Sequence, residues 1–212
     1  MSPTKVFIVD DHEVVREGLR TVLQKDPAMS VVGMSEDALD LVKKLKKVQP
    51  DVVILDISLP DKSGLDALKD LKQLYPKTRV LILSMHPEGR VAVRALRAGA
   101  SGYLNKQTAA EELIKAIQTI KNGRKYVSPG LAEQLAEELD SKSSPQPHTD
   151  LSDREFEIMS LIASGEAASE IAKKLHLSVN TVSTYRTRIL EKLRVKTTAE
   201  LTRYALEHRL ID

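Results

Sequence analysis

Acidic, hydroxyl and basic side chains directly follow four strand-like segments in the first half of this 212-residue chain. In chain order they are Asp10 and Asp11, Asp56, Ser84 and Lys106. In an open parallel sheet, ligand sites lie beyond the carboxyl ends of the strands. Three carboxylates gathered there repel one another unless a cation lies between them, and Mg²⁺ best suits such an oxygen-donor set. We therefore predict a Mg²⁺ site that could hold a phosphoryl group against an acceptor carboxylate.

Each of these residues also has an ordinary explanation when it is taken alone. An aspartate after a strand is usually a turn or helix-cap residue. The pair Asp10-Asp11 could simply be solvated, and His12 is expected at the start of a helix rather than as a ligand. Because polar residues follow four strands, and one of them is a lysine, we favour the chemical interpretation.

Strand-like and helix-like patterns alternate through residues 1–123. The apolar run 51–55 is typical of a strand buried on both faces. This alternation predicts an α/β domain with a doubly wound parallel sheet covered by helices on both faces. The expected strands are residues 5–9, 30–34, 51–55, 79–83 and 101–104. The expected helices are residues 16–25, 38–47, 63–75, 88–98 and 109–122.

The composition excludes several classes of protein. The chain has no cysteine, which rules out disulfides, thiolate catalysis and cysteine-based zinc fingers. No apolar run approaches the roughly 20 residues that cross a bilayer, and the N-terminus lacks a signal-peptide profile. We expect a cytoplasmic protein.

A connecting region follows the α/β domain. Ser128 and Pro129 are a helix cap and a first-turn proline, so a helix is expected over about 129–139. Residues 140–150 contain no apolar side chain and are interpreted as a flexible linker. The expected domains are residues 1–125, a linker over 126–150, and a second domain over 151–212.

The second domain has a purely helical pattern. Ser152 with Glu155, and Thr197 with Glu200, form sequence patterns of the capping box that begins a helix. We predict an all-α domain of four helices. They run from Ser152 to Gly165, over 168–175, over 179–193, and from Thr197 to Glu207.

The third of these helices is amphipathic, with Val182, Ile189 and Leu193 on its core side. The segment from Lys173 to Lys196 contains seven basic residues and one acidic residue, although the domain as a whole is neutral. A basic, short-polar helix that follows a turn and a short helix suits the DNA major groove. The alternative is a small helical bundle with an ordinary charged surface, in which Arg186 only covers the core.

The first domain resembles a known family. Its strand ends and neighbouring turns match the receiver domain of two-component response regulators over residues 1–125. The matching pieces are Ile8-Val9-Asp10-Asp11-His12, Asp51 to Asp56, Leu59-Pro60, Gly64-Leu65, Leu83-Ser84 and Gly99 to Lys106. The resemblance implies a flavodoxin-like fold with strand order 2-1-3-4-5.

The resemblance also implies roles for the residues at the strand ends. Asp56 would be the phosphoacceptor, which attacks a phosphohistidine on a sensor histidine kinase. The Mg²⁺ ligands would be Asp10, Asp11, Asp56 and the carbonyl of Ser58. The phosphoryl group would be held by Lys106, while Ser84 and Tyr103 would be the switch residues and Tyr103 would follow inward. Met85, His86 and Ser58 would influence phosphoryl lifetime.

The second domain resembles the LuxR-type DNA-binding domain. The matching residues are Leu151 to Glu155, Gly165, Ile171-Ala172, Leu175, Ser178, Thr181-Val182 and Ile189 to Leu193. The order receiver, linker, LuxR-type domain is that of the NarL/FixJ subfamily. The candidate DNA contacts are Thr181, Ser183, Thr184, Tyr185, Thr187, Arg188, Lys192 and Lys196. The last helix would form a dimer contact through Leu201, Tyr204 and Ala205. Ser183 replaces a lysine that many relatives carry, so their operator preference is not carried over.

The leading hypothesis is a transcription regulator that Asp56 phosphorylation switches towards a homodimer bound to paired DNA half-sites, and not an enzyme in the usual sense. A second hypothesis is a small-molecule phosphatase with an aspartate nucleophile. Such enzymes typically need an acid two residues after the nucleophile, where this chain has Ser58. A third hypothesis keeps DNA binding but makes the first domain a phosphate-independent interaction module.

Overall fold

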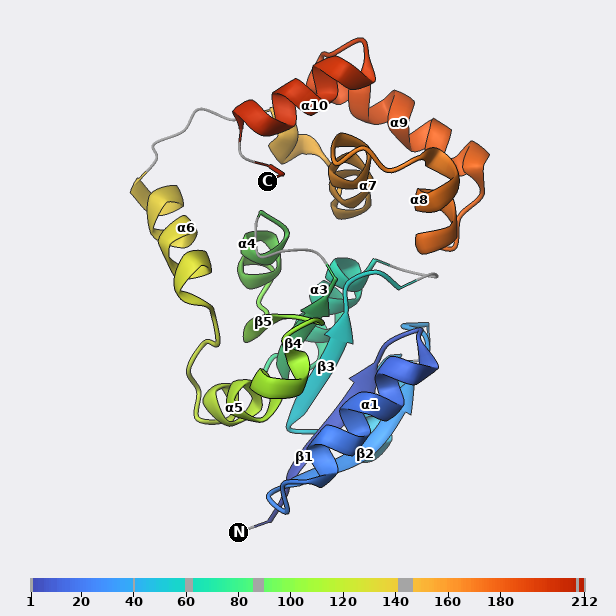
Figure 1. Ribbon diagram of the computed structural model, residues 1–212. Helices are drawn as coiled ribbons and strands as arrows, with labels where there is room; N and C mark the ends of the chain where they lie inside the picture. Colours follow the sequence, from blue (N-terminus) through green and yellow to red (C-terminus); the bar gives the residue numbers. More distant parts are fainter. Residues whose placement is uncertain are drawn as a thin grey trace. The chain divides into compact units, whose positions relative to one another are not determined.

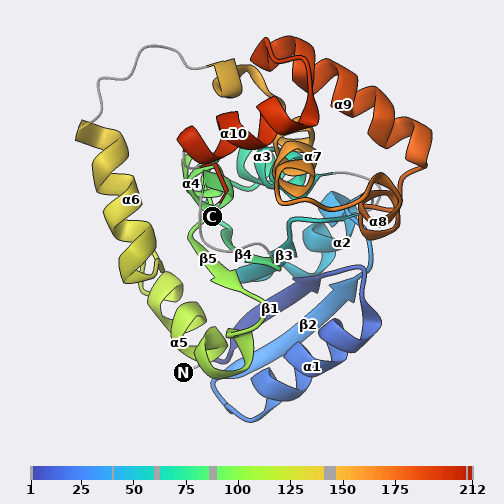
Figure 2. The same cartoon turned by 45° about the horizontal axis from the view of Figure 1, so that its top comes forward.

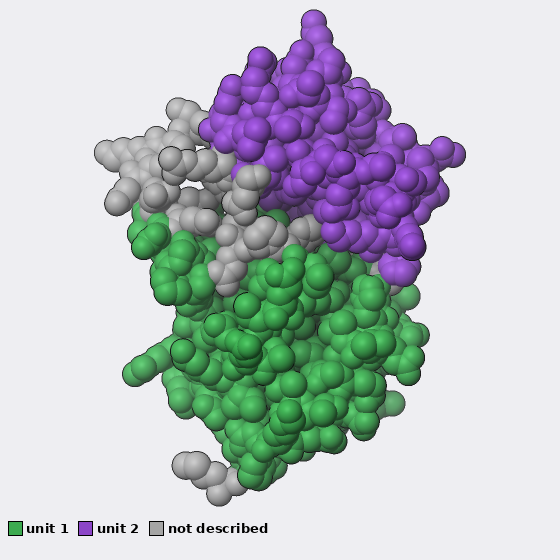
Figure 3. Space-filling model, in the orientation of Figure 1, with its two compact units in different colours: residues 1–136 green, residues 137–212 purple. Residues whose placement is uncertain are grey.

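The computed structural model describes residues 2–39, 41–59, 63–85, 90–140, 147–208 and 210–211 (Figure 1). The chain forms two compact units, residues 1–136 and residues 137–212 (Figure 3). No helix within the described ranges is both long and apolar enough to span a bilayer.

The first unit contains a five-stranded parallel sheet in the order β2-β1-β3-β4-β5. This arrangement confirms the predicted doubly wound α/β fold. Polar groups at the carboxyl ends of β1, β3, β4 and β5 therefore share one edge of the sheet. The strands are β1 (Thr4–Val9), β2 (Met29–Ser35), β3 (Val52–Asp56), β4 (Arg79–Ser84) and β5 (Gly102–Asn105).

Helices cover both faces of this sheet (Figure 2). On one face, α1 and α5 pack against Val6, Ile8 and Ile54. On the other face, α2, α3 and α4 pack against residues that alternate with these along the strands, including Val53 and Leu55. The helices are α1 (Glu13–Gln24), α2 (Leu41–Val48), α3 (Gly64–Leu74), α4 (Arg90–Arg97) and α5 (Ala109–Lys121).

The first part of the expected linker belongs to the first unit. Tyr126 forms a parallel bridge to Gly102, and its carbonyl accepts a hydrogen bond from the backbone N–H of Tyr103 at 3.3 Å. A Cβ atom on Gly102 would lie 2.9 Å from Tyr126, so this close approach requires glycine. Helix α6 (Pro129–Asp140) follows, and its Leu131 is fully buried in the core that contains α2, α3 and α4.

The second unit is helical, and Ser152, Ser178 and Thr197 cap three of its helices. Ser152 and Glu155 form the complete capping box at α7. Thr197 caps α10 through the N–H of Glu200, but the Glu200 carboxylate accepts from the N–H of Lys196 instead. The helices are α7 (Asp153–Ala163), α8 (Ala168–Lys174), α9 (Val179–Leu193) and α10 (Thr198–Glu207).

The end of the expected flexible stretch is structured. Residues Pro147–Asp150 form a 3-10 helix, η1, ahead of α7. Its His148 is 5% exposed, and the ring Nδ1 lies 3.1 Å from the hydroxyl of Tyr204. The rings of His148, Tyr204 and His208 also contact one another. Composition alone predicts flexibility here, because the partners of His148 lie 56 and 60 positions away and no local pattern indicates them.

Candidate functional site

The carboxyl ends of β1, β3 and β5 bring Asp10, Asp56 and Lys106 together. Both carboxylates are almost fully buried, at 1% exposed each. The Nζ atom of Lys106 lies 2.7 Å from Asp10 Oδ2 and 2.7 Å from Asp56 Oδ2. One buried ammonium group is thus shared by two buried carboxylates, and such charge-assisted contacts are short and strong.

The cluster of Asp10, Asp56 and Lys106 carries an excess of negative charge. Burial raises the pKa of Asp56, the positive charge of Lys106 opposes this, and the negative charge of Asp10 raises it further. Burial alone would lower the pKa of Lys106, but its two carboxylate partners outweigh burial and raise that pKa. A positive ion added beside these carboxylates would relieve the repulsion between them.

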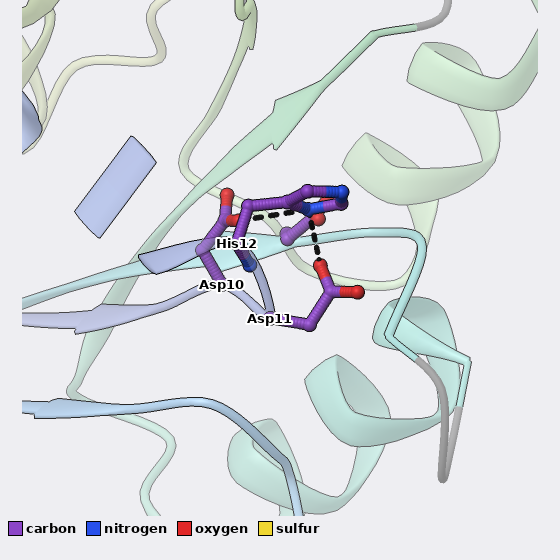
Figure 4. Close-up of side chains that lie close together, drawn as sticks. Asp10, Asp11 and His12 are labelled. Atoms are coloured by element: carbon purple, nitrogen blue, oxygen red, sulfur yellow. Dashed lines mark hydrogen bonds and ion pairs between the residues drawn. The ribbon is translucent and has the colours of Figure 1, made fainter. Parts of the chain in front are cut away.

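Asp11 and His12 extend the acidic group towards solvent. His12 Nδ1 lies 2.6 Å from Asp11 Oδ1 and 3.5 Å from Asp10 Oδ1, while the ring is largely exposed (Figure 4). Asp10, Asp11, His12 and Asp56 each offer one ligand atom, and these atoms lie within 4.8 Å of one another. This donor set, mainly carboxylate oxygens, fits a divalent cation. His12 also stands at the start of α1, where the sequence places it.

Of the remaining expected pocket residues, Ser58 contacts Asp56 directly. The backbone N–H of Ser58 donates to Asp56 Oδ1 at 3.2 Å. Ser84 is buried at the end of β4, and its carbonyl accepts from the N–H of Lys106 at 2.8 Å. Tyr103 on β5 is fully buried. Met85 is exposed, whereas Pro60 and His86 lie outside the described residues.

Helix α9 presents a polar face on the second unit. Val182, Ile189 and Leu193 are buried against the rest of the domain. The candidate residues Ser183, Thr184, Thr187 and Arg188 are exposed, and Thr181 and Tyr185 are half-buried. The outer face carries an open hollow lined by Asn180, Thr181, Thr184, Tyr185 and Arg188. Our sequence reasoning missed Asn180, although its spacing of four and eight residues from Thr184 and Arg188 places it on their face.

Two family models match this chain. One describes the response regulator receiver domain and matches residues 6–118, and the other describes bacterial regulatory proteins of the luxR family and matches residues 149–205. The oxygen regulatory protein NreC of Staphylococcus carnosus is 39% identical, over 98% of this chain and 99% of that protein. The response regulator UvrY of Escherichia coli K12 is 35% identical, over 98% of this chain and 95% of that protein.

The chain belongs to the two-component response regulators with a LuxR-type DNA-binding domain. Members of this family regulate transcription. Among solved structures, the regulator is similar to RcsB of Salmonella typhimurium, with 29% identity and a TM-score of 0.66, over 96% of this chain and 97% of that chain. It is also similar to RcsB in an RcsB–DNA complex, with 30% identity and a TM-score of 0.62, over 96% of this chain and 98% of that chain.

On α9, the basic side chains of Lys192 and Arg186 are engaged within the DNA-binding domain. Lys192 Nζ lies 2.6 Å from the carboxylate of Glu155 and 3.3 Å from the carbonyl of Asp150. Burial alone would raise the pKa of Glu155, but hydrogen bonds from Lys192 and Ser152 outweigh burial and lower it. Arg186 donates to the hydroxyl of Thr198 at 2.9 and 3.1 Å. Lys192 is therefore paired within the domain, and its expected contact with a DNA phosphate stays a prediction.

Other polar side chains of the domain remain available. Within the described part of the chain, the side chains of Asn180, Arg188, Arg194 and Lys196 make no hydrogen bond or ion pair, and all four are exposed.

The expected dimer residues of α10 need correction. Leu201 and Ala205 are both 0% exposed, inside the domain, so the prediction that they contact a second copy is wrong. Tyr204 is half-buried and holds His148. The helical spacing of apolar residues does not distinguish the side that packs inside a domain from the side that meets a partner. The exposed side of α10 instead carries Arg203 and Leu206.

Proposed function

We propose that Asp56 accepts the phosphoryl group from a phosphohistidine of a sensor histidine kinase. One carboxylate oxygen attacks phosphorus, the bond from phosphorus to the histidine nitrogen breaks, and an acyl phosphate forms. The observation that supports this most directly is the 2.7 Å contact of Lys106 with both Asp56 and Asp10. Because this ammonium group is shared, it can turn to the phosphoryl oxygens once Asp56 is phosphorylated.

Mg²⁺ is the proposed ion. Asp10, Asp11, Asp56 and the carbonyl of Ser58 would hold it, and it would neutralise charge on the transferred phosphoryl group. Ser84 would donate its hydroxyl to a phosphoryl oxygen, because it ends the strand beside β3 and is buried next to Lys106. Tyr103, on the neighbouring strand, would report this change to the surface formed with α6.

The phosphorylation proposal is tested with acetyl phosphate and Mg²⁺ on the full chain. We expect one phosphoryl group per wild-type chain and none on Asp56→Asn, as measured by intact-protein mass spectrometry. Asp66→Asn is the matched control, because Asp66 is a half-exposed aspartate on α3 that pairs with Lys69. Stoichiometric labelling of Asp56→Asn would refute the assignment.

We further propose that α9 enters the DNA major groove and that two copies of the domain occupy paired half-sites. The exposed residues of α9 and of the turn after it support this, since Arg188 on α9 is suited to base edges and Lys196 beyond its end to phosphates. In a band-shift titration, Arg188→Ala should lose sequence-specific binding, whereas Arg20→Ala, at an exposed arginine of α1 that pairs with Glu17, serves as the charge-matched control. Equal affinity of wild type and Arg188→Ala for a selected operator would contradict the proposal.

The relatives support the proposed assembly. The solved structures of RcsB include two RcsB dimers bound to two parallel DNAs and an RcsB–DNA complex. We propose the same kind of homodimer here, formed on phosphorylation. A dimer contact on α10 would use exposed positions such as Leu206.

A further inference from the structure

The threonine hydroxyl groups on the polar face of α9 are already used in hydrogen bonds. The hydroxyl of Thr184 donates to the carbonyl of Asn180 at 3.0 Å, and that of Thr187 donates to the carbonyl of Ser183 at 3.2 Å. The hydroxyl of Thr181 lies 2.8 Å from that of Ser178. Each bond joins residues three or four positions apart, so the helix itself satisfies these groups.

This bonding changes what the threonines offer to DNA. A hydroxyl has one proton, and a hydroxyl that donates it to the preceding turn cannot also donate it to a base. The threonine that donates back along the helix keeps its γ-methyl group as an apolar contact on its exposed side. In the major groove, thymine carries a methyl group on its edge, and a threonine methyl can pack against it.

The neighbours on the same face supply the polar contacts. Asn180, Thr184 and Arg188 are spaced by four residues and line the same hollow. The side chains of Asn180 and Arg188 have no hydrogen-bond or ion-pair partner among the described residues, so their donors are available. An arginine pairs with the N7 and O6 atoms of guanine, and an asparagine with the N6 and N7 atoms of adenine.

We infer that Thr184 and Thr187 recognise thymine methyl groups in the operator, and that Asn180 and Arg188 make the base-edge hydrogen bonds beside them. The inference rests on the proposed function of α9 as the helix that enters the major groove. The two threonines are three residues apart, or about 4.5 Å along the helix. This separation is close to the roughly 3.4 Å step between base pairs, so the two thymines should lie at adjacent or nearly adjacent positions.

The test begins with selection of half-sites from a random duplex pool by the full chain, treated with acetyl phosphate and Mg²⁺. Each conserved thymine is then replaced by deoxyuridine, which removes only the methyl group. For wild type, we expect about a fourfold loss of affinity at the thymine that Thr184 contacts, the factor expected for burying one methyl group. Selected half-sites without a conserved thymine would overturn the inference.

Two variants distinguish the methyl group from the hydroxyl group. Thr184→Ser keeps the hydroxyl and removes the methyl, so the ratio of affinities for the thymine and deoxyuridine operators should fall towards one. Thr184→Val keeps a methyl and removes the hydroxyl, so the ratio should stay near about four. Thermal unfolding of both variants checks that the domain is folded. If Thr184→Ser keeps the ratio and Thr184→Val loses specific binding, the hydroxyl reads the base and the inference fails.

Arg188→Ala separates this inference from the proposed function. If Arg188→Ala loses specific binding while Thr184→Ser keeps the wild-type thymine preference, only the methyl inference is overturned. If neither substitution changes binding to the selected operator, α9 is not the helix that recognises the bases. The proposed function of α9 and the methyl inference then both fail.

Discussion

Lys106 is the residue on which the charge balance of the phosphorylation pocket depends. Its ammonium group contacts two carboxylates that are each 1% exposed. Removing one partner of a buried ion pair leaves an uncompensated buried charge, which is among the most destabilising changes in a protein. The stability of the receiver domain therefore depends on this side chain, which is also the one proposed to hold the phosphoryl group.

We predict that Lys106→Met lowers the free energy of unfolding of the receiver domain by roughly 3–5 kcal/mol in EDTA. Urea unfolding followed by circular dichroism measures this change. Adding Asp56→Asn to Lys106→Met should restore part of the loss, because one of the two unpaired carboxylates is then neutral. Lys69→Met removes an exposed lysine and is the control. Equal stability of Lys106→Met and wild type would refute the shared ion pair.

The raised pKa of Asp56 leads to a second prediction for a single residue. Burial raises this pKa in the folded state, so folding favours the protonated form of Asp56. As pH rises and Asp56 ionises, the free energy of unfolding therefore falls. In metal-free buffer at pH 7, Asp56→Asn should therefore be more stable than wild type. The difference should vanish below about pH 4, the ordinary range of an aspartate. A difference that stays constant between pH 4 and pH 7 would contradict this charge effect.

The basic residues around α9 should contribute unequally to the salt dependence of DNA binding. Lys196 has an unengaged side chain among the described residues, whereas Lys192 is paired with Glu155 at 2.6 Å. Lys196→Ala should lower the slope of log K against log salt concentration by about 1. Lys192→Ala should lower it less, because its ion pair must break before it meets a phosphate. Band shifts at four salt concentrations measure both slopes, and the reverse order would refute the argument.

At the scale of elements, local signals account for the helix boundaries that the sequence predicts well. Helices α9 and α10 span the predicted residues because Ser178 and Thr197 cap them and their apolar residues repeat with helical spacing. Tyr126 and His148 could not be placed in this way. Their partners, Gly102 and Tyr204, lie 24 and 56 positions away, and no local pattern encodes such contacts.

Helix α6 is predicted to contribute to the stability of the receiver domain. It lies in the region expected to be a linker, yet Leu131 is fully buried with the receiver core. Leu131→Ala should lower the free energy of unfolding of the receiver domain by about 2–5 kcal/mol, the cost of truncating a buried leucine. The same substitution at the exposed Leu39 should change it little. Similar, small effects of both substitutions in urea unfolding would mean that α6 is not part of the receiver core.

At the scale of the whole molecule, we expect phosphorylation of one unit to change DNA binding by the other. The chain carries its proposed acceptor in one compact unit and its proposed reading helix in the other. If phosphorylation joins two chains, the DNA meets two α9 helices and two sets of basic residues. The number of phosphates contacted, and with it the number of counterions released, then doubles.

We therefore expect the slope of log K against log salt concentration to become roughly twice as steep when wild type is treated with acetyl phosphate and Mg²⁺. Titration of a two-half-site operator at several salt concentrations measures the slope, and light scattering measures the oligomeric state in the same buffers. Asp56→Asn is the control, because its slope should be the same with and without the phosphodonor. If the wild-type slope stays constant while affinity rises, phosphorylation acts within one chain. The DNA then does not contact the basic residues of a second chain.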